Sequence, residues 1–299
     1  MVISTAVFLA FISAQQAAPH PPVVFYVPER VYDTAAGAFV DFEVMLARLS
    51  KADVVFVGEQ HDDPNTHRLE AAILDGLHRR KVTPVLSLEM FERDAQRWLN
   101  DYFAEQIGEE EMLKNARPWP RYATDYRRMV EMARERKWTV VAANVPRRLA
   151  ADVSKNGKEA IGKLSETDRA MIARELQCPP DDYSRRFAES MSGHPAGTQT
   201  PEQQQAMVER FYWAQCVKDE TMAEAIAAAY EKKSAAGPIV HYNGAFHSDF
   251  GLGTAERVRR RLPGKKTMVV TMIPVEDLDT VAPAGEDLKR ADYLVYTVK

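Results

Sequence analysis

The chain of 299 residues has little cysteine and no excess of positive charge. Its two cysteines, Cys178 and Cys216, do not form a C-x-x-C pair, which excludes zinc ribbons and thioredoxin-like redox chemistry. Lys and Arg number 39 against 43 Asp and Glu, so the net charge is −4. Because a nucleic-acid surface needs clustered basic residues, we expect no nucleic-acid partner.

Long apolar runs are also lacking, so no transmembrane helix is predicted. Residues 2–12 form an apolar run of the length of a signal-peptide core, and Ala14 offers a small residue for cleavage. No Lys or Arg precedes the run, and no Cys follows it that could carry a lipid. We therefore expect residues 1–22 to be a signal peptide and flexible mature start, and the protein to be periplasmic or exported. In an oxidising compartment, Cys178 and Cys216 either form a disulfide or stay as two buried thiols.

Two common hydrolase motifs are missing. The chain contains neither H-E-x-x-H, the helical zinc signature, nor G-x-S-x-G, the nucleophile elbow of serine hydrolases. Their absence removes the common helical zinc signature and weakens the interpretation as a serine hydrolase.

Four short apolar runs are present, and each ends in chemically capable residues. The runs cover residues 54–57, 85–88, 139–143 and 238–243. The polar residues that follow them are Glu59 and His61, Glu89, Asn144 and Arg147, and His247. Such runs, separated by helical stretches, are typical of buried parallel strands, and ligands bind outside the carboxyl ends of those strands. The pattern predicts one cleft lined by all four groups.

The same pattern predicts the fold class: an α/β fold with a mostly parallel central sheet flanked by helices. Residues 23–147 and 238–299 are expected to form the core domain. Residues 148–237 show no strand pattern and are expected to form a large helical insertion over the carboxyl edge of the sheet. Within the insertion, a long helix is expected over 201–233 with Thr200 as its cap. Asn65 is expected to cap the helix after the first core strand, with His67 on its surface.

Glu59, His61, Glu89 and His247 suit two kinds of chemistry. Two imidazoles and two carboxylates can hold a divalent transition metal with open positions. The same groups can also act without metal, with a carboxylate orienting a histidine that serves as general base. In support, Asn144 can polarise a carbonyl and Arg147 can pair with a carboxylate or propionate.

Haem is the other candidate ligand, because the insertion supplies side chains able to bind its iron axially. Tyr183, His194 and Tyr212 are the candidates there, and no spacing rule selects one of them.

Several separated segments resemble the ChaN-like haem-binding uptake family, within the Tiki/TraB/erythromycin-esterase superfamily. The segments are residues 55–74, Glu89, residues 143–147, residues 214–223, and residues 244–247 with Gly251. The resemblance covers nearly all of residues 31–273. It implies an α/β domain with a helical insertion, an envelope location, and haem binding linked to iron uptake.

The resemblance also implies an alternative and a set of partners. Related branches are metal-dependent proteases or esterases that use paired Gly-x-x-His motifs and glutamates, here residues 58–61 and 244–247 with Glu59 and Glu89. The implied partners are haem or another small molecule, envelope haem-transport components, and a second copy of the chain in a homodimer. The sequence leaves open whether the haem site and the Glu/His cleft are one site or two.

Overall fold

The computed structural model describes residues 27–192, 200–233 and 237–299. The predicted signal peptide and His194 lie outside these ranges. The strands are β1 Glu29–Asp33, β2 Ala38–Val40, β3 Val54–Glu59, β4 Val85–Glu92, β5 Val140–Asn144, β6 Ile239–Gly244, β7 Thr267–Val275 and β8 Tyr293–Val298. The α-helices are α1 Phe42–Leu49, α2 Pro64–Arg79, α3 Gln96–Phe103, α4 Glu109–Ala116, α5 Arg127–Glu135, α6 Arg147–Asn156, α7 Glu166–Arg169, α8 Asp182–Met191, α9 Pro201–Lys232 and α10 Gly253–Arg261.

The strands of the described residues form one sheet in the order β2-β1-β8-β7-β3-β6-β4-β5. All neighbouring pairs from β8 to β5 are parallel, and β1 pairs antiparallel with both β8 and β2. The predicted α/β fold with a mostly parallel sheet is therefore confirmed. Strand β6, which follows the helical insertion, lies between β3 and β4, so the segments after β3 and β6 lie side by side.

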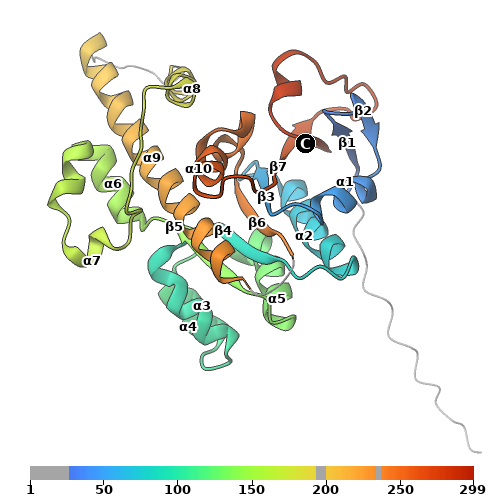
Figure 1. Ribbon diagram of the computed structural model, residues 1–299, viewed down its shortest axis with the longest axis horizontal. Helices are drawn as coiled ribbons and strands as arrows, with labels where there is room; N and C mark the ends of the chain where they lie inside the picture. The colour runs from blue at the N-terminus through green and yellow to red at the C-terminus, as the bar shows by residue number, and fades with distance from the viewer. Residues whose placement is uncertain (1–26, 193–199, 234–236) are drawn as a thin grey trace, which may run out of the picture.

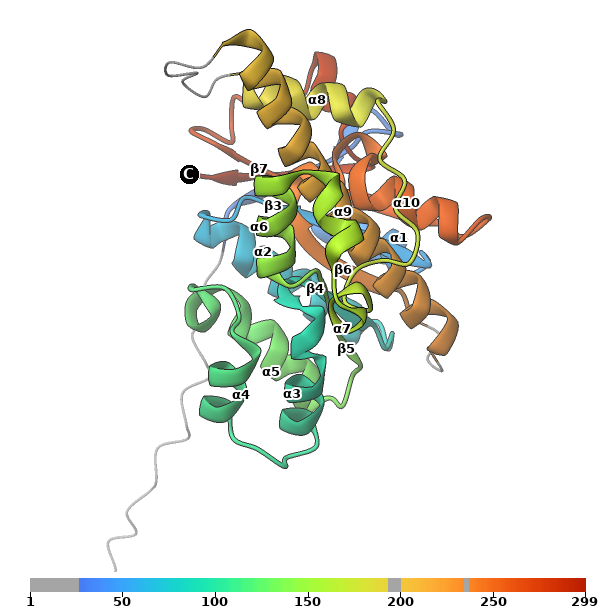
Figure 2. The ribbon, with the colours of Figure 1, turned by 90° about the vertical axis from the view of Figure 1, so that its left-hand side faces the viewer.

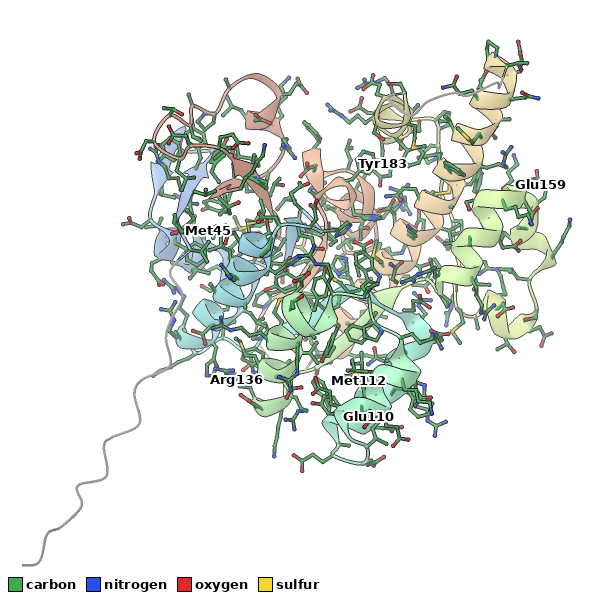
Figure 3. All side chains as sticks on the ribbon, turned by 180° about the vertical axis from the view of Figure 1, so that it is seen from behind. Met45, Glu110, Met112, Arg136, Glu159 and Tyr183 are labelled. Carbon is green, nitrogen blue, oxygen red and sulfur yellow. A yellow bond between two sulfur atoms is a disulfide. The ribbon has the colours of Figure 1, made fainter. Side chains whose placement is uncertain are left out.

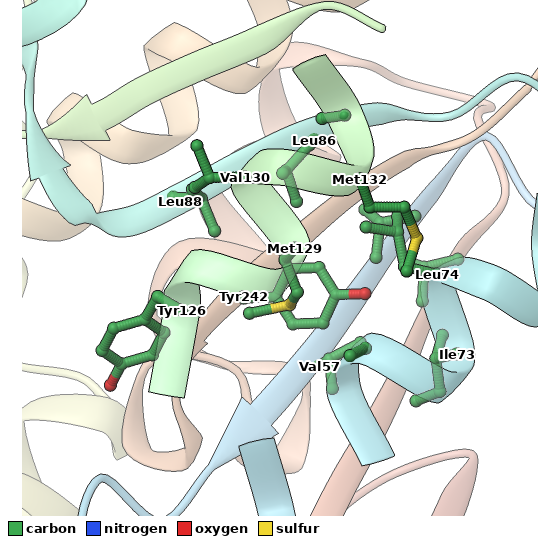
Figure 4. Close-up of a cluster of buried hydrophobic side chains, with 14 of the residues drawn as sticks. Val57, Ile73, Leu74, Leu86, Leu88, Tyr126, Met129, Val130, Met132 and Tyr242 are labelled. Carbon is green, nitrogen blue, oxygen red and sulfur yellow. The ribbon is translucent and has the colours of Figure 1, made fainter. Parts of the chain in front are cut away.

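Helices cover both faces of the sheet (Figure 1). Along β3, Val55 and Val57 point into an apolar cluster with α2 and α5, whereas Val54 and Phe56 point into a second cluster with α9 and α10. Alternate residues of a strand face opposite sides, so a strand that is buried on both sides reads as a continuous apolar run. Figure 4 shows the first cluster, with Tyr126 at its edge and its hydroxyl directed away from the apolar side chains.

Helix α9 links the core to the rest of the insertion. Thr200 caps it through a capping box with Gln203, as the sequence predicts for the cap residue. Its carboxyl-terminal half packs on the sheet through Ala223 and Ile226. Its amino-terminal half extends past the sheet toward α6 and α8 (Figures 1 and 2). The helix therefore carries side chains from the core to the carboxyl edge of the sheet.

Two local details complete the fold. The cap of α2 is Asp63, whose carboxylate accepts a hydrogen bond from the backbone of Asn65, so the predicted cap at Asn65 is wrong. Pro64 occupies the first helical position, where its missing N–H needs no partner, so the helix begins before Asn65.

In the described residues, no helix is both long and apolar enough to cross a membrane.

Cys178 and Cys216 form a disulfide that joins the loop before α8 to α9. Of the two states that the sequence leaves open, the structure thus has the bonded one. The bond closes a loop with a sequence separation of 38 and anchors the chain that leads to Tyr183.

Candidate functional site

A cleft at the carboxyl edge of the sheet brings together the four residues that the sequence singles out. Glu59, His61, Glu89 and His247 all line it, and its volume is about 550 Å³. They come from the end of β3, the loop after it, the body of β4 and the short 3-10 turn after β6. The volume is within the range of small-molecule and cofactor sites, roughly 300–1,000 Å³.

His61 is the most exposed of the four, with 49% of its side chain accessible to solvent. Its Nδ1 atom hydrogen-bonds Oε1 of Glu59, and its ring packs edge-on against Trp119 at a centroid distance of 4.8 Å. Burial lowers the pKa of His61, but the hydrogen bond to Glu59 and the charges of Glu89 and Glu59 together outweigh burial, and the net shift is upward. Glu59 thus holds the ring in one orientation.

Gly244 makes room for His61. A Cβ atom built on Gly244 would lie 2.7 Å from Nε2 and 2.8 Å from Cε1 of the His61 ring. The parallel register of β3 and β6 places Glu59 opposite Gly244, which explains this close approach. Any larger side chain at Gly244 must displace the imidazole or itself.

His247 lies between two buried carboxylates. Its Nε2 atom is 3.2 Å from Oε1 of Glu89, and its Nδ1 atom is 2.7 Å from Oδ1 of Asp219. Burial lowers the pKa of His247, but the charges of Glu89 and Asp219 raise it to about 10. Burial raises the pKa of Glu89, yet the charge of His247 keeps it well below its ordinary value. His247 is therefore an imidazolium at neutral pH.

Asp219, on α9, is fully buried and accepts three hydrogen bonds. Besides His247, the hydroxyls of Thr254 and Tyr183 donate to it at 2.7 and 2.8 Å. Gln215 adds a further bond, because its amide donates to the Tyr183 hydroxyl at 3.2 Å. The side chains on α8, α9 and α10 thus hold His247 in place.

The two predicted haem-binding tyrosines that the structure describes are buried and already bonded. Tyr183, on α8 (labelled in Figure 3), donates its hydroxyl to Asp219 on α9. Tyr212 donates to the backbone oxygen of Pro179 at 2.9 Å. Burial raises the pKa of both hydroxyls, that of Tyr212 to about 12. Neither tyrosine lines the cleft of the four Glu and His residues.

Asn144 and Arg147 lie beside the cleft, in a second hollow of about 380 Å³. The two cavities share Trp119 and Lys218. The amide of Asn144 donates to the backbone oxygen of Glu89 at 3.0 Å, so it joins β4 to β5. The Arg147 side chain is exposed, and its Nε atom lies 3.8 Å from Oε1 of Glu92, which lines the same hollow.

His67 is buried rather than on the surface, and the expectation for it is wrong. Its Nδ1 atom lies 3.5 Å from Oε2 of Glu59 and 3.1 Å from Oε2 of Glu70. Burial lowers the pKa of His67, but the two neighbouring carboxylates raise it to about 10. His67 and Glu70 share the face of α2 that carries Leu74. Polar residues at helical spacing on a buried apolar face are the pattern that identifies such a cluster from sequence.

Tyr126 completes this second cluster from a π-helical turn over Tyr122–Tyr126. Its hydroxyl donates to Oε1 of Glu59 at 2.9 Å. Burial raises the pKa of Glu59, but hydrogen bonds from His61 and His67 lower it to about 2. Glu59 is thus the group common to the cleft and to the buried cluster behind it.

The family model described as "Haem-binding uptake, Tiki superfamily, ChaN" matches residues 45–258, a range that includes every residue of the cleft and of the buried cluster named above. The chain belongs to this family. The match also confirms the resemblance of the separated segments to ChaN-like proteins. No curated protein sequence matches the chain.

Three solved structures share the fold of this ChaN-like protein. ChaN of Campylobacter jejuni, a structure described as showing cofacial haem binding, is 19% identical, covers 91% of this chain and 97% of its own, and has a TM-score of 0.68. A succinoglycan biosynthesis protein is 10% identical, with coverages of 85% and 90% and a TM-score of 0.51. A Bacillus cereus protein is 12% identical, with coverages of 85% and 90% and a TM-score of 0.50. At these identities the likeness establishes the fold alone.

Proposed function

We propose that this ChaN-like protein binds haem in the cleft, with Nε2 of His61 as the axial ligand of the iron. The observation that carries the proposal is the orientation of this ring. Nδ1 is bonded to Glu59, and Nε2 has no hydrogen-bond partner among the described residues. A carboxylate bonded to the far nitrogen of a ligating histidine fixes its tautomer and raises its basicity. Histidine is also a common proximal ligand of haem iron.

The walls of the cleft suit an amphipathic macrocycle. Trp119, Phe187 and Phe246 supply aromatic surface, and Lys218 supplies positive charge. Arg290 also lines the cleft, where it pairs with Asp249 at 2.7 Å. Flat apolar groups pack well on aromatic rings, and ammonium groups pair with carboxylates such as the propionates of haem. In this proposal the protein carries the bound haem as a source of iron and does not use it as a cofactor.

A titration of haemin into the purified protein, followed by absorbance, tests this proposal. We expect a saturable Soret shift at a defined stoichiometry. His61→Ala is expected to weaken binding at least about tenfold, which corresponds to about 1.4 kcal/mol. His78→Ala is the matched control, because His78 is exposed and does not line the cleft. No saturable shift in the wild-type protein would refute haem binding.

The same titration separates His61 from the ligands proposed in the insertion. Tyr183→Phe, Tyr212→Phe and His194→Ala keep the cleft histidine. If one of these variants changes the Soret spectrum and His61→Ala does not, the axial ligand lies in the insertion and the cleft is a different site.

Export and assembly belong to the same proposal. We propose that residues 1–22 direct the chain to the periplasm, where it meets envelope haem-transport components. Mass spectrometry of the mature protein, expressed from the full chain, tests for cleavage near Ala14. Light scattering with and without haemin tests for a homodimer, since two surfaces can share a flat ligand.

A metal-dependent hydrolase is the second candidate function. It is favoured by the convergence of Glu59, His61, Glu89 and His247 on one cleft. His247 lies between two carboxylates, and Glu59 bonds the far nitrogen of His61. Both imidazoles thus have the carboxylate partners that metal-binding histidines use. Hydrolysis of ester or peptide substrates that needs added Zn²⁺, Mn²⁺ or Co²⁺ and is lost in His61→Ala would support it.

A further inference from the structure

A buried cluster behind the cleft contains Glu59, His67 and Glu70. One ligand atom of each lies within 4.8 Å of the others. All three side chains are almost completely buried. The cluster shares Glu59 with the four predicted cleft residues and contains none of the other three.

Two carboxylate oxygens in the cluster have no hydrogen-bond donor. Oε2 of Glu59 and Oε1 of Glu70 are both buried, and neither has a partner in the described part of the chain. A buried, unpaired carboxylate oxygen carries a large desolvation cost. Asp125 does not balance the charge, because it is an acid itself and pairs with Arg121 at 2.7 Å. His67 lies beside both carboxylates and, when protonated, supplies one positive charge for two acids. A divalent cation in the same place supplies two.

The distances suit a metal ion. Nδ1 of His67 is 3.5 Å from Oε2 of Glu59 and 3.1 Å from Oε2 of Glu70. Around a first-row divalent ion with bonds of about 2.1 Å, neighbouring ligand atoms lie roughly 3.0 to 3.4 Å apart, for octahedral and tetrahedral geometry respectively. The contact with Glu70 lies inside that range and the contact with Glu59 lies 0.1 Å above it, and both are long for hydrogen bonds between charged groups.

The surroundings of His67 resemble those of a metal-binding imidazole. Its Nε2 atom faces the backbone oxygen of His61 at 3.3 Å and Oδ2 of Asp125 at 3.4 Å. Metal-binding histidines almost always donate their other ring N–H to a carbonyl or carboxylate. A metal ion that enters displaces the proton on Nδ1, and with the proton on Nε2 kept, the lone pair of Nδ1 points at the two carboxylates. Tyr126 then holds the remaining oxygen of Glu59.

We propose that Glu59, His67 and Glu70 bind one divalent transition-metal ion, of the Zn²⁺ or Mn²⁺ class. The ion neutralises the two carboxylates and fixes Glu59, which in turn orients His61. Glu59 also lines the cleft, so the cleft gives an entry route. The site is distinct from the haem site of the proposed function and does not depend on it.

Metal analysis of the haem-free protein tests the proposal. After removal of metal with a chelator, one equivalent of Zn²⁺ or Mn²⁺ is expected to bind. Glu70→Gln and His67→Gln are expected to weaken binding at least about a hundredfold, as loss of a ligand exceeds the 10–100-fold effect of losing an outer partner. His247→Gln, which changes the cleft but not the cluster, is the control and is expected to retain the ion.

Three outcomes would overturn the proposal. Absence of bound metal at saturating concentration would mean that protons alone hold the cluster. Loss of the ion in His247→Gln, together with its retention in Glu70→Gln, would place the metal in the cleft. The third outcome is measured on the wild-type protein and so does not depend on the folding of a variant. Electron spin echo spectroscopy of the Cu²⁺- or Mn²⁺-loaded protein counts the imidazoles bound to the ion. One imidazole is expected for the cluster, and two would indicate His61 and His247.

Discussion

Substitution of Gly244 by alanine isolates the orientation of His61 from the rest of the fold. The added methyl group would lie 2.7 Å from Nε2 of His61, well inside normal contact distance. Gly244 has φ −54° and ψ 134°, which alanine adopts without strain. The His61 ring is half exposed and free to swing outward. The methyl group should therefore displace the ring and leave the backbone in place.

The magnitude follows from the bond that is lost. When the ring moves, the hydrogen bond between His61 and the ionised Glu59 breaks, and a bond of this kind contributes about 1.5–3 kcal/mol. If haem binding requires the ring in its present orientation, the same free energy is lost from binding. We expect the Kd for haemin to rise about tenfold to hundredfold.

Gly58→Ala is the matched control. Its methyl group would lie 2.9 Å from the Cα atom of Ala245, which is backbone and has no room to rotate away. This variant should lose stability, by about 1–3 kcal/mol for an overpacked core, and show no comparable specific effect on His61. Chemical denaturation measures the stability of both variants, and absorbance titration measures their affinity for haemin. If Gly244→Ala binds haemin with wild-type affinity, His61 does not act in its present orientation.

Three further predictions concern stability. Replacing Cys178 and Cys216 by serine should lower the free energy of unfolding by about 4 kcal/mol, as the chain-entropy treatment gives for a loop of this length. The midpoint of denaturant unfolding measures the loss, and an unchanged midpoint would contradict the prediction. Asp219→Asn leaves the buried imidazolium of His247 with one carboxylate fewer. We expect the free energy of unfolding, measured by thermal unfolding, to fall by about 3–5 kcal/mol. A fall of less than about 1 kcal/mol would mean that Asp219 is not charged. Burial lowers the pKa of His241 to about 3, so its neutral form stabilises the fold above pH 6.5 and that contribution is lost as the pH falls from 6.5 toward 3. The advantage of the wild-type protein over His241→Gln should therefore shrink by about 2 kcal/mol between pH 7.5 and pH 5, and a constant difference would refute this.

The outline of the sheet is readable in the sequence because buried parallel strands need continuous apolar runs. The runs at 54–57 and 85–88 lie within β3 and β4, and the run at 238–243 overlaps β6. Strand β4 runs further than predicted, to Glu92, so Glu89 lies within the strand and not after it. Local pattern does not show where a strand stops when its last residues are buried against other elements.

The cleft residues are predictable for the same reason, but their partners are not. Glu59 and His247 follow apolar runs and so belong to the carboxyl edge of the sheet. Asp219 lies in the middle of a long helix, where an acidic residue usually faces solvent. Its burial depends on α8 and α10, which arrive from other parts of the chain. His67 is a comparable case, because α5 and the turn before it cover α2.

By itself, the sequence determined the α/β class, the long capped helix α9 and the gathering of glutamate and histidine at one edge of the sheet. These follow from hydrophobic periodicity, capping and the rule that parallel strands present their carboxyl ends together. The order of the strands was decided only by tertiary structure. Strand β6 inserts between β3 and β4, although some 150 residues separate it from β4, and this places Gly244 beneath His61. Strand order depends on how the helices of both faces pack over the whole sheet, and no local stretch of sequence contains all of those contacts.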